Sequence, residues 1–535
     1  MTEVIVLGLD GATWEVLMPF IEDGLLPNIG NIITTGRSGK LESTFPPITA
    51  PAWLSMATGQ NPGKTGVFYF LNRDDPNSFD FEPLGSDKFY GKSFWDVLSA
   101  RDQSVGVFNY PMLYPPYDID GFMVSGLGSD ADDTITYPEP LGMELDKVTD
   151  GYQVKVSYAD PKYQGRPDAL KQDLLEIIEK REQAIDYLLS EKNPDHFFGI
   201  ISATDWAQHY FWRYHDEEHA LYDPEAGHED ALQQIWERVD ETVGLVTEHA
   251  RGEDANLLLV SDHGFGPVNR TFHSNEWLKQ QGFSYAEEQS LINQTRTKYF
   301  PYLRRVGEAV VRFAPQLNDI GKSIGESIRS SPGDGIDFDR SIAFAPRQNI
   351  TCGMIYMLTD DPDDKRAVID ELDKLVDRND GPESIEVYEP EDLYHGPKLD
   401  LAPDLLFEIN GFECAVDPRP TAENNVFSDG SPSKARNGGH NQEGILIATG
   451  PDIGTDDAAI EADIYDIAPT LLYLHDTSIP QEMDGSVLGG LFEDEIVDDQ
   501  LISTDSLENL VSIGKSSKRK DDQEVQERLK DLGYI

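Results

Sequence analysis

The sequence Val4-Ile5-Val6-Leu7-Gly8-Leu9-Asp10-Gly11 lies near the start of the chain and decides the fold. Its first six residues form a continuous apolar run, which is typical of a strand that is buried on both faces. The run ends at a carboxylate followed by a glycine, residue types that turn a chain at the end of a strand. We therefore expect a buried strand over residues 4–9 in a parallel sheet.

Further apolar runs bounded by turn residues recur along the 535-residue chain, and amphipathic helical patterns lie between several of them. The additional candidate strands are residues 104–108, 196–201, 256–260, 404–408 and 444–448. The candidate helices are residues 27–35, 168–189, 229–249, 364–376 and 464–474. Such strands alternating with helices predict an α/β fold in which helices cover both faces of a mostly parallel sheet.

Changes in pattern divide the chain into four segments. We expect residues 1–268 to form the first part of an α/β core. Residues 269–349 read as an insert or lid with helical pieces over 302–313 and 317–328. Residues 350–490 are expected to complete the core and to carry a small inserted lobe. Residues 491–535 are expected to form a tail, first acidic and then basic, with a helical pattern over 524–532.

The charge of the chain excludes one class of function. It has 98 Asp and Glu against 43 Lys and Arg, a net charge of −55, while 39% hydrophobic and 10% aromatic residues are enough for large cores. Such a surface repels a phosphate backbone, so binding of a nucleic-acid duplex through a basic face is excluded, and an anionic membrane is disfavoured. Concentrated salt would screen the self-repulsion of the carboxylates, so we expect a halophilic, haloarchaeal host.

Cysteine content and hydropathy bear on the cellular compartment of the protein. The two cysteines, Cys352 and Cys414, cannot build a disulfide framework or a CxxC metal site, so we expect buried thiols. The sequence shows no secretion signal before the first apolar run and no apolar run long enough to span a membrane. We therefore expect a cytoplasmic protein, whose oligomeric state the sequence leaves open.

Metal-ligand residue types follow two of the predicted strands. Asp10 ends the strand 4–9, and Asp205 and His209 follow the strand 196–201 at a spacing that places both side chains on one face of a helix. A carboxylate at a strand tip suits a divalent cation, and an Asp–His pair on one helical face can bind one metal. The alternatives are a simple Asp-Gly turn at Asp10 and a helix cap at Asp205.

Two further sites strengthen the metal hypothesis. Asp262 and His263 directly follow the apolar run 256–260, where packing requires neither a charge nor an imidazole, and His440 lies in a glycine-rich loop before the strand 444–448. Together with the first group they supply three Asp and three His at strand ends, where reactive groups gather in parallel sheets. Six such ligands suffice for two divalent cations, and mixed Asp and His ligands serve zinc, manganese and iron alike.

Thr49 is the candidate nucleophile. It lies between Pro47 and Pro51, and a helical pattern over residues 52–58 follows it. The free amides at a helix N-terminus stabilise negative charge, so a threonine oxygen and a phosphoryl oxygen could both be held there. The alternative is that Thr49 only caps the helix.

The sequence resembles the alkaline phosphatase superfamily, and specifically its type I phosphodiesterase/nucleotide pyrophosphatase branch. The matching positions, in the order and context of that family, are Asp10, Thr49, Asp205, His209, Asp262, His263 and His440. Further similar stretches are residues 25–28, 58–66, 462–470 and 483–485, so the resemblance covers roughly residues 1–490. It implies an alkaline-phosphatase-like three-layer sandwich with a mostly parallel central sheet and an inserted lobe.

The resemblance also implies roles for these residues. One metal site would be formed by Asp205, His209 and His440, and the other by Asp10, Asp262 and His263 with the Thr49 oxygen. Thr49 would attack phosphorus and form a covalent phosphothreonine, which water then hydrolyses. The implied partner is a small phosphorylated substrate.

The sequence departs from the family at one substrate contact. At the register where nucleotide pyrophosphatases have an asparagine that holds a phosphoryl oxygen, this chain has Phe70, with Asn72 two residues later. Asn72 is therefore a candidate for substrate contact, and the nucleotide-diester assignment is in doubt. Two further candidates are Asn109, at the tip of the strand that ends in Phe108, and His273, which could reach substrate from the insert, although a surface histidine is the simpler interpretation of His273. Thr49 also stands where a sulfatase has Cys or Ser, and threonine cannot become a formylglycine, which argues against a sulfatase.

The favoured function is thus a two-metal phosphohydrolase, and specifically a phosphodiesterase. A phosphomutase, or a phosphonate or phosphomonoester hydrolase, on the same core is the first alternative. An inactive, metal-stabilised binding protein is an alternative of another class, and the presence of all seven positions argues against it.

Overall fold

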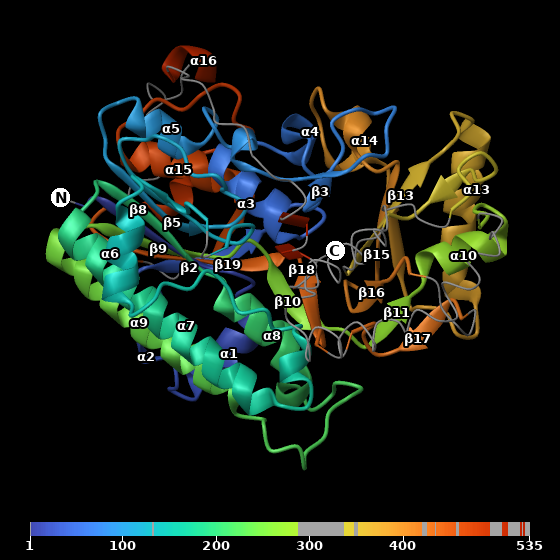
Figure 1. Cartoon of the computed structure of the whole chain (residues 1–535), viewed down its shortest axis with the longest axis horizontal. Helices are drawn as coiled ribbons and strands as arrows, with labels where there is room; N and C mark the ends of the chain where they lie inside the picture. The colour runs from blue at the N-terminus through green and yellow to red at the C-terminus, as the bar shows by residue number, and fades with distance from the viewer. Residues whose placement is uncertain are drawn as a thin grey trace, which may run out of the picture.

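The protein is described by a computed structural model over residues 2–130, 133–286, 336–346, 351–419, 425–433, 435–455, 459–492 and 506–511, and at 525, 526, 528 and 529. Within these residues a large sheet lies between two layers of helices, and a smaller lobe lies beside them (Figure 1). The expected three-layer α/β sandwich with an additional lobe is therefore present.

The large sheet has nine strands in the order β20-β2-β19-β9-β1-β8-β5-β6-β7. Their bounds are Ile460–Asp463, Arg37–Glu42, Glu443–Thr449, Asn256–Val260, Val4–Leu9, His196–Ile201, Val105–Tyr110, Gly121–Ser125 and Thr136–Tyr137 in that order. The five strands from β9 to β6 run parallel. Strand β19 is antiparallel to both β9 and β2, and β7 is antiparallel to β6. The sheet is therefore mostly parallel, as expected.

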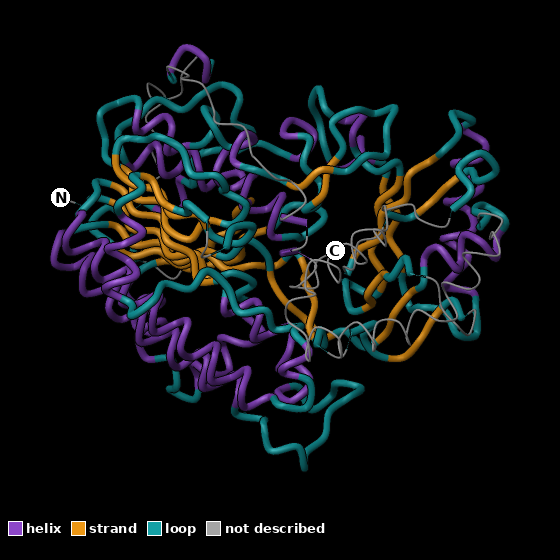
Figure 2. Tube along the Cα trace, in the orientation of Figure 1, coloured by secondary structure: helices purple, strands orange, loops and turns teal. Residues whose placement is uncertain are grey.

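The apolar run of β1 is divided between two cores. Val4 and Val6 face one core, while Ile5, Leu7 and Leu9 face the other, because successive side chains of a strand point to opposite faces. One face is covered by α3 (Thr49–Thr58), α5 (Phe94–Ser99) and α15 (Ile467–Leu474). The other is covered by α1 (Trp14–Glu22), α2 (Pro27–Thr35), α6 (Leu141–Val148), α7 (Pro167–Tyr187), α8 (Ala203–His215) and α9 (Ala231–Glu253). Figure 2 shows the sheet between these two layers.

A glycine in β1 sets the height of α3 above the sheet. A Cβ at Gly8 would lie 2.6 Å from Cη2 of Trp53 and 3.0 Å from Cγ1 of Ile200, both closer than packed carbon atoms approach. Trp53 is fully buried, and Tyr110 of β5 donates a hydrogen bond of 2.8 Å to its carbonyl. The bare backbone at Gly8 therefore lets α3, which begins at Thr49, lie close against β1.

Two predicted strands differ from expectation: one belongs to another sheet, and the other runs in the opposite direction. Residues 404–408 form a strand, β15 (Leu405–Ile409), but it belongs to a separate sheet with the order β12-β13-β15-β14. Residues 444–448 lie in the large sheet as β19, but antiparallel to its neighbours. A continuous apolar run shows that a strand is buried on both faces, and it says nothing about direction or sheet. Strand β2 was missed because its sequence, Arg-Ser-Gly-Lys-Leu-Glu, is largely polar.

The smaller lobe has its own apolar core. Its strands are β11 (Arg270–Phe272), β12 (Ala343–Phe344), β13 (Cys352–Met357), β14 (Ile385–Tyr388), β15, β16 (Cys414–Val416) and β17 (Phe427–Asp429), with helices α10 (Ser274–Gln281) and α13 (Pro362–Asp373). It thus draws on both the expected insert and the segment after it. The ribbon of β10 (Gly264–Pro267) and β18 (Gly438–Asn441) lies between the lobe and the large sheet (Figure 1).

Other expectations have mixed outcomes. Cys352 and Cys414 are buried free thiols, as expected. The helical pieces over 302–313 and 317–328 lie outside the described residues, as does most of the pattern over 524–532. In the described part of the chain, every helix is too short or too polar to cross a membrane.

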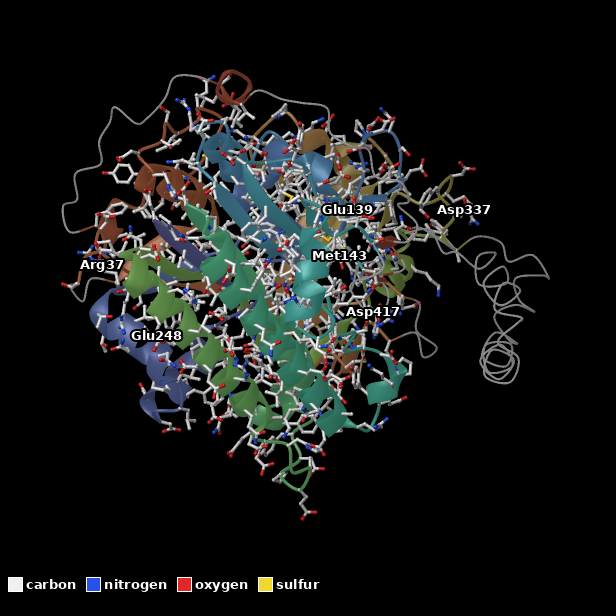
Figure 3. All side chains as sticks on the ribbon, turned by 60° about the vertical axis from the view of Figure 1, so that its left-hand side comes forward. Arg37, Glu139, Met143, Glu248, Asp337 and Asp417 are labelled. Atoms are coloured by element: carbon white, nitrogen blue, oxygen red, sulfur yellow. The ribbon has the colours of Figure 1, made fainter. Side chains whose placement is uncertain are left out.

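Figure 3 shows Glu139, Met143 and Glu248 along the outside of the helical layer, where Met143 is 73% exposed.

Candidate metal centre

The pairing of three central strands brings the predicted acidic residues to one edge of the sheet. Strand β1 lies between β8 and β9, and Leu9 pairs with Ile201 while Gly8 pairs with Val260. Because all three strands are parallel and end at the same level, Asp10 and Asp262 follow them at neighbouring positions. Asp205 lies in the first turn of α8, directly after β8.

The antiparallel strand β19 explains how two residues from distant parts of the sequence reach the same edge. A strand that runs against β9 begins where β9 ends, so His440, in the ribbon strand just before β19, lies at the carboxyl edge. Strand β2 runs against β19, with Glu42 paired to Glu443. It therefore ends at this edge too, and the loop after it leads directly to Thr49.

Asp205, His209 and His440 form a tight group. His440 Nε2 lies 3.0 Å from Asp205 Oδ1 and 3.0 Å from His209 Nε2, and His209 Nε2 lies 3.3 Å from Asp205 Oδ1. The helical spacing of Asp205 and His209 thus places both ligands on one face of α8, as the sequence predicts.

His263 lies between this group and a second one. Ligand atoms of Asp10, Asp262 and His263 lie within 4.8 Å of one another, and so do those of Asp205, His263 and His440. The rings of His263 and His440 stack with their centroids 3.6 Å apart. His263 Nε2 is 3.3 Å from Asp262 Oδ2 and 3.8 Å from Asp10 Oδ1.

Backbone carbonyls fix the tautomers of the three histidines. Nδ1 of His209, His263 and His440 lies 2.8, 3.1 and 3.0 Å from the carbonyl oxygens of Gly438, Gly264 and Pro47, respectively. A carbonyl can only accept, so each Nδ1 donates its proton and each Nε2 carries a lone pair. All three Nε2 atoms point into the site, which is the arrangement that metal-binding histidines adopt.

The buried carboxylates also fit a cation. Asp10 Oδ1 and Asp262 Oδ2 are buried and have no hydrogen-bond partner among the described residues. Burial, and then the neighbouring carboxylates of Asp262 and Asp205, raise the pKa of Asp10 well above its ordinary value. Burial lowers the pKa of His440 to about 3, with the charge of Arg436 as a second cause. Neutral imidazoles beside carboxylates that resist ionisation are a donor set that a bound cation stabilises.

Thr49 is the first residue of α3, and its hydroxyl faces this centre. The N-cap position belongs to Ile48, so the capping interpretation of Thr49 does not hold. The Thr49 side chain is fully buried, and Oγ1 lies 3.4 Å from His263 Nε2. At the start of α3, Pro51 has no N–H and the Ala52 amide donates to the Ile48 carbonyl at 3.0 Å, so Thr49 and Ala50 carry the amides that have no partner within the helix.

Each of the three candidate substrate contacts makes hydrogen bonds within the protein, while Asn109 Oδ1 and His273 Nδ1 are buried and have no hydrogen-bond partner among the described residues. Asn72 Oδ1 accepts hydrogen bonds from the amides of Phe68 and Tyr69 at 2.7 and 3.1 Å and so closes its own turn. Asn109 has a left-handed φ of 57° and donates to the Ile200 carbonyl at 2.8 Å. His273 Nε2 lies 2.9 Å from Ser428 Oγ in the smaller lobe.

Several supporting residues were not found from the sequence. Gln208 donates to the Gly11 carbonyl at 2.7 Å, and Thr204 donates to the Asp10 carbonyl at 2.7 Å, so α8 also holds the turn after β1. Ser43 donates to the Asp262 carbonyl at 2.5 Å. Thr204 directly precedes Asp205 and Gln208 directly precedes His209, so both could have been inferred from that pair. Ser43 carries no such signal, because its partner is distant in the sequence.

This arrangement defines a class of protein. Three carboxylates and three imidazoles converge beside a buried hydroxyl at a helix N-terminus, at the carboxyl edge of a parallel sheet, which is the kind of centre that metal-assisted phosphoryl transfer uses. The chain belongs to the type I phosphodiesterase/nucleotide pyrophosphatase family, whose model matches residues 4–408. It is thus a phosphoester hydrolase of the metal-dependent alkaline phosphatase superfamily.

Two solved structures are weakly similar to this chain. Phosphonoacetate hydrolase from Sinorhizobium meliloti 1021 in complex with phosphonoacetate is 14% identical, with a TM-score of 0.49 over 87% of this chain and 94% of that one. The same enzyme in complex with phosphonoformate is 15% identical, with a TM-score of 0.48 over the same shares. No curated protein matches the chain.

Proposed function

We propose that the protein is a two-metal phosphodiesterase that acts through a covalent phosphothreonine at Thr49. The observation that carries the proposal is the position of the buried Thr49 hydroxyl, at the N-terminus of α3 and 3.4 Å from His263. His263 belongs to two overlapping groups, together five side chains, within each of which the ligand atoms lie within 4.8 Å of one another, and His209 lies 3.0 Å from His440 of that set. Asp205, His209 and His440 would hold one cation. Asp10, Asp262 and His263, with the Thr49 oxygen, would hold the other, and zinc suits this donor set.

The residues of the chain contribute at each step. When bound, two divalent cations would lower the pKa of the Thr49 hydroxyl and neutralise charge on the attacking and leaving oxygens. Thr49 Oγ1 forms a bond to phosphorus while the bond from phosphorus to the first alcohol breaks, and that alcohol leaves with a proton. Water then attacks phosphorus, the bond to Thr49 breaks, and Thr49 recovers its proton. The amides at the start of α3 hold the charged oxygens of the phosphoryl group throughout.

Activity on two chromogenic esters tests this proposal. Bis-p-nitrophenyl phosphate and p-nitrophenyl phosphate are incubated in concentrated KCl with Zn²⁺ or Mn²⁺. Thr49→Ala should lower kcat by about three orders of magnitude or more, because it removes the nucleophile. Thr58→Ala is the matched control, since Thr58 is equally buried in α3 and donates only to the Leu54 carbonyl.

The outcomes separate the alternatives. Preference for the diester supports a phosphodiesterase, and preference for the monoester supports the phosphomonoesterase alternative. If wild type and Thr49→Ala hydrolyse both esters equally, Thr49 is not the nucleophile. If wild type is inactive on both esters and on a panel of phosphonates, the enzymatic interpretation fails.

A further inference from the structure

Two cavities of opposite character border the β10–β18 ribbon, and both include Gly439 and His440 in their walls. The first, which we call the Arg436 cavity, has a volume of about 30 Å³. Its walls include Ile48, Phe70, Val268, His209, His440 and Arg436. Most of this lining is apolar, and two of the proposed metal ligands form part of it, so a group bound there would adjoin the metal centre.

Arg436 is held firmly in this wall. It is 8% exposed, and its Nε donates a 2.8 Å hydrogen bond to the hydroxyl of Tyr158. The Tyr158 ring stacks on the ring of His209, with centroids 5.4 Å apart and planes 19° apart. Tyr158 therefore fixes the guanidinium relative to a metal-ligand side chain. Among the described residues that line the cavity, Arg436 is the only lysine or arginine.

The second cavity that borders the ribbon is larger and acidic. It has a volume of about 300 Å³, and its walls include Glu15, Asp216, Glu218 and Glu413. Burial, and then the charges of Asp216 and Glu413, raise the pKa of Glu15, as expected where carboxylates crowd together. Carboxylates therefore dominate the charge of this cavity, whereas a guanidinium lies in the wall of the Arg436 cavity.

We propose that the Arg436 cavity is a subsite for a carboxylate carried by the substrate on its leaving group. This inference rests on the proposed function, because the reacting phosphoryl group must lie at the neighbouring metal centre. It adds a substrate class: small phosphoric esters that bear a second, carboxylic, anionic group.

Size and charge both favour a carboxylate. A cavity needs about 10–15 Å³ to hold one water, so about 30 Å³ accommodates about two, which matches the two oxygens of a carboxylate and excludes a nucleobase. A guanidinium presents its N–H groups in one plane, a geometry that matches a carboxylate. The apolar walls strengthen the attraction because they keep water, and hence screening, away from the pair.

Matched phosphonates test the subsite under the proposed function, because ester hydrolysis leaves a carbon–phosphorus bond intact. Release of inorganic phosphate is measured alongside, and cleavage of a phosphonate would overturn the phosphodiesterase assignment in favour of a phosphonate hydrolase. Calorimetry on the Zn²⁺-loaded protein compares phosphonoacetate with ethylphosphonate, and 3-phosphonopropionate with propylphosphonate. Within each pair only the carboxylate differs from a methyl group. At least one acid should bind about tenfold more tightly than its partner, which is about 1.4 kcal/mol.

Variants assign this preference to Arg436. In Arg436→Gln the Kd ratio should fall to within about twofold, because the charge is lost, and Arg436→Lys should retain part of it. The Kd of ethylphosphonate should be the same in wild type and in every variant, and so should the Kd of propylphosphonate. Arg213→Gln, which removes an arginine of α8 that does not line the cavity, is the matched control and should leave the ratio unchanged.

The failure of the subsite differs from the failure of the proposed function. Equal affinity within both pairs in wild type overturns the subsite while phosphonate binding still supports the phosphoryl centre. A carboxylate preference that persists in Arg436→Gln also overturns it. If neither series binds, or both bind equally well without metal, the proposed function fails and the subsite with it. If Arg436→Gln does not fold, the wild-type ratio and Arg436→Lys still decide.

Discussion

Substitution of Gly8 by alanine should impair catalysis although Gly8 touches no substrate. The new Cβ would lie 2.6 Å from Trp53 Cη2, whereas packed carbons prefer about 3.5–4.0 Å, so α3 must move away from β1 by about 1 Å. Thr49 lies one helical turn before Trp53 and moves with it, away from His263. A misplacement of about 1 Å at reacting atoms costs about 100-fold in rate.

The same contact should also lower the stability of the fold. Overpacking of a buried site typically costs about 1–3 kcal/mol in the free energy of unfolding. Gly106→Ala is the matched control. Gly106 lies on strand β5, away from α3, and its new Cβ would lie 2.4 Å from Cζ of Phe122. The control should be destabilised similarly, but its kcat should stay within about twofold of wild type, since nothing displaces Thr49.

The assay combines kcat for bis-p-nitrophenyl phosphate with urea unfolding of both variants. The double variant Gly8→Ala/Trp53→Phe should recover about tenfold in kcat over Gly8→Ala, because phenylalanine lacks the outer ring that meets the new Cβ. The reasoning is refuted if Gly8→Ala destabilises the protein with kcat unchanged. It is equally refuted if Gly106→Ala loses as much kcat as Gly8→Ala.

Three further predictions concern metal, pH and salt. Adding metal to EDTA-treated protein at about 100 times the Kd should stabilise it by about 2.7 kcal/mol per site, and the gain in Tm should halve in Asp10→Asn or His209→Gln. Equal gains in all three proteins would contradict two separate sites. Burial raises the pKa of Asp96 to about 7 from an ordinary 3.8, so the fold retains this proton and loses stability as pH rises from about 4 to about 7. Asp96→Asn should therefore gain about 2–4 kcal/mol relative to wild type between pH 4 and pH 8 in urea unfolding, and a constant difference would refute this. Because 98 acidic residues oppose 43 basic ones, activity and Tm should rise between about 0.1 and 1 M KCl as screening increases, whereas a steady fall would exclude a halophilic origin of the acidity.

Short-range patterns explain why most of the sheet, and the group of Asp and His side chains at its edge, could be predicted from the sequence. Asp10 and Asp262 directly follow apolar runs that form adjacent parallel strands, and Asp205 and His209 are separated by one helical turn. In each case the feature that positions the side chain lies within a few residues of it. The structure brings these residues together with Thr49 and His440 at one edge of the sheet.

Features that depend on distant pairing were not predictable. The antiparallel direction of β19, which brings His440 to the centre, results from its pairing with β9 and β2. The placement of β15 in a second sheet depends on its pairing with β13 and β14. Arg436 and Tyr158 are joined by one hydrogen bond across a long stretch of sequence, and a single arginine in a loop carries no signal of its own.

The central claim, that Thr49 attacks phosphorus, is tested most directly by mass spectrometry of the enzyme quenched in acid during steady turnover of bis-p-nitrophenyl phosphate. The account predicts that the peptide containing Thr49 gains the mass of the transferred phosphoryl ester, that fragmentation assigns it to Thr49, and that Thr58→Ala gives the same result. A fully active enzyme in which that peptide remains unmodified, or in which another residue carries the group, would contradict the account.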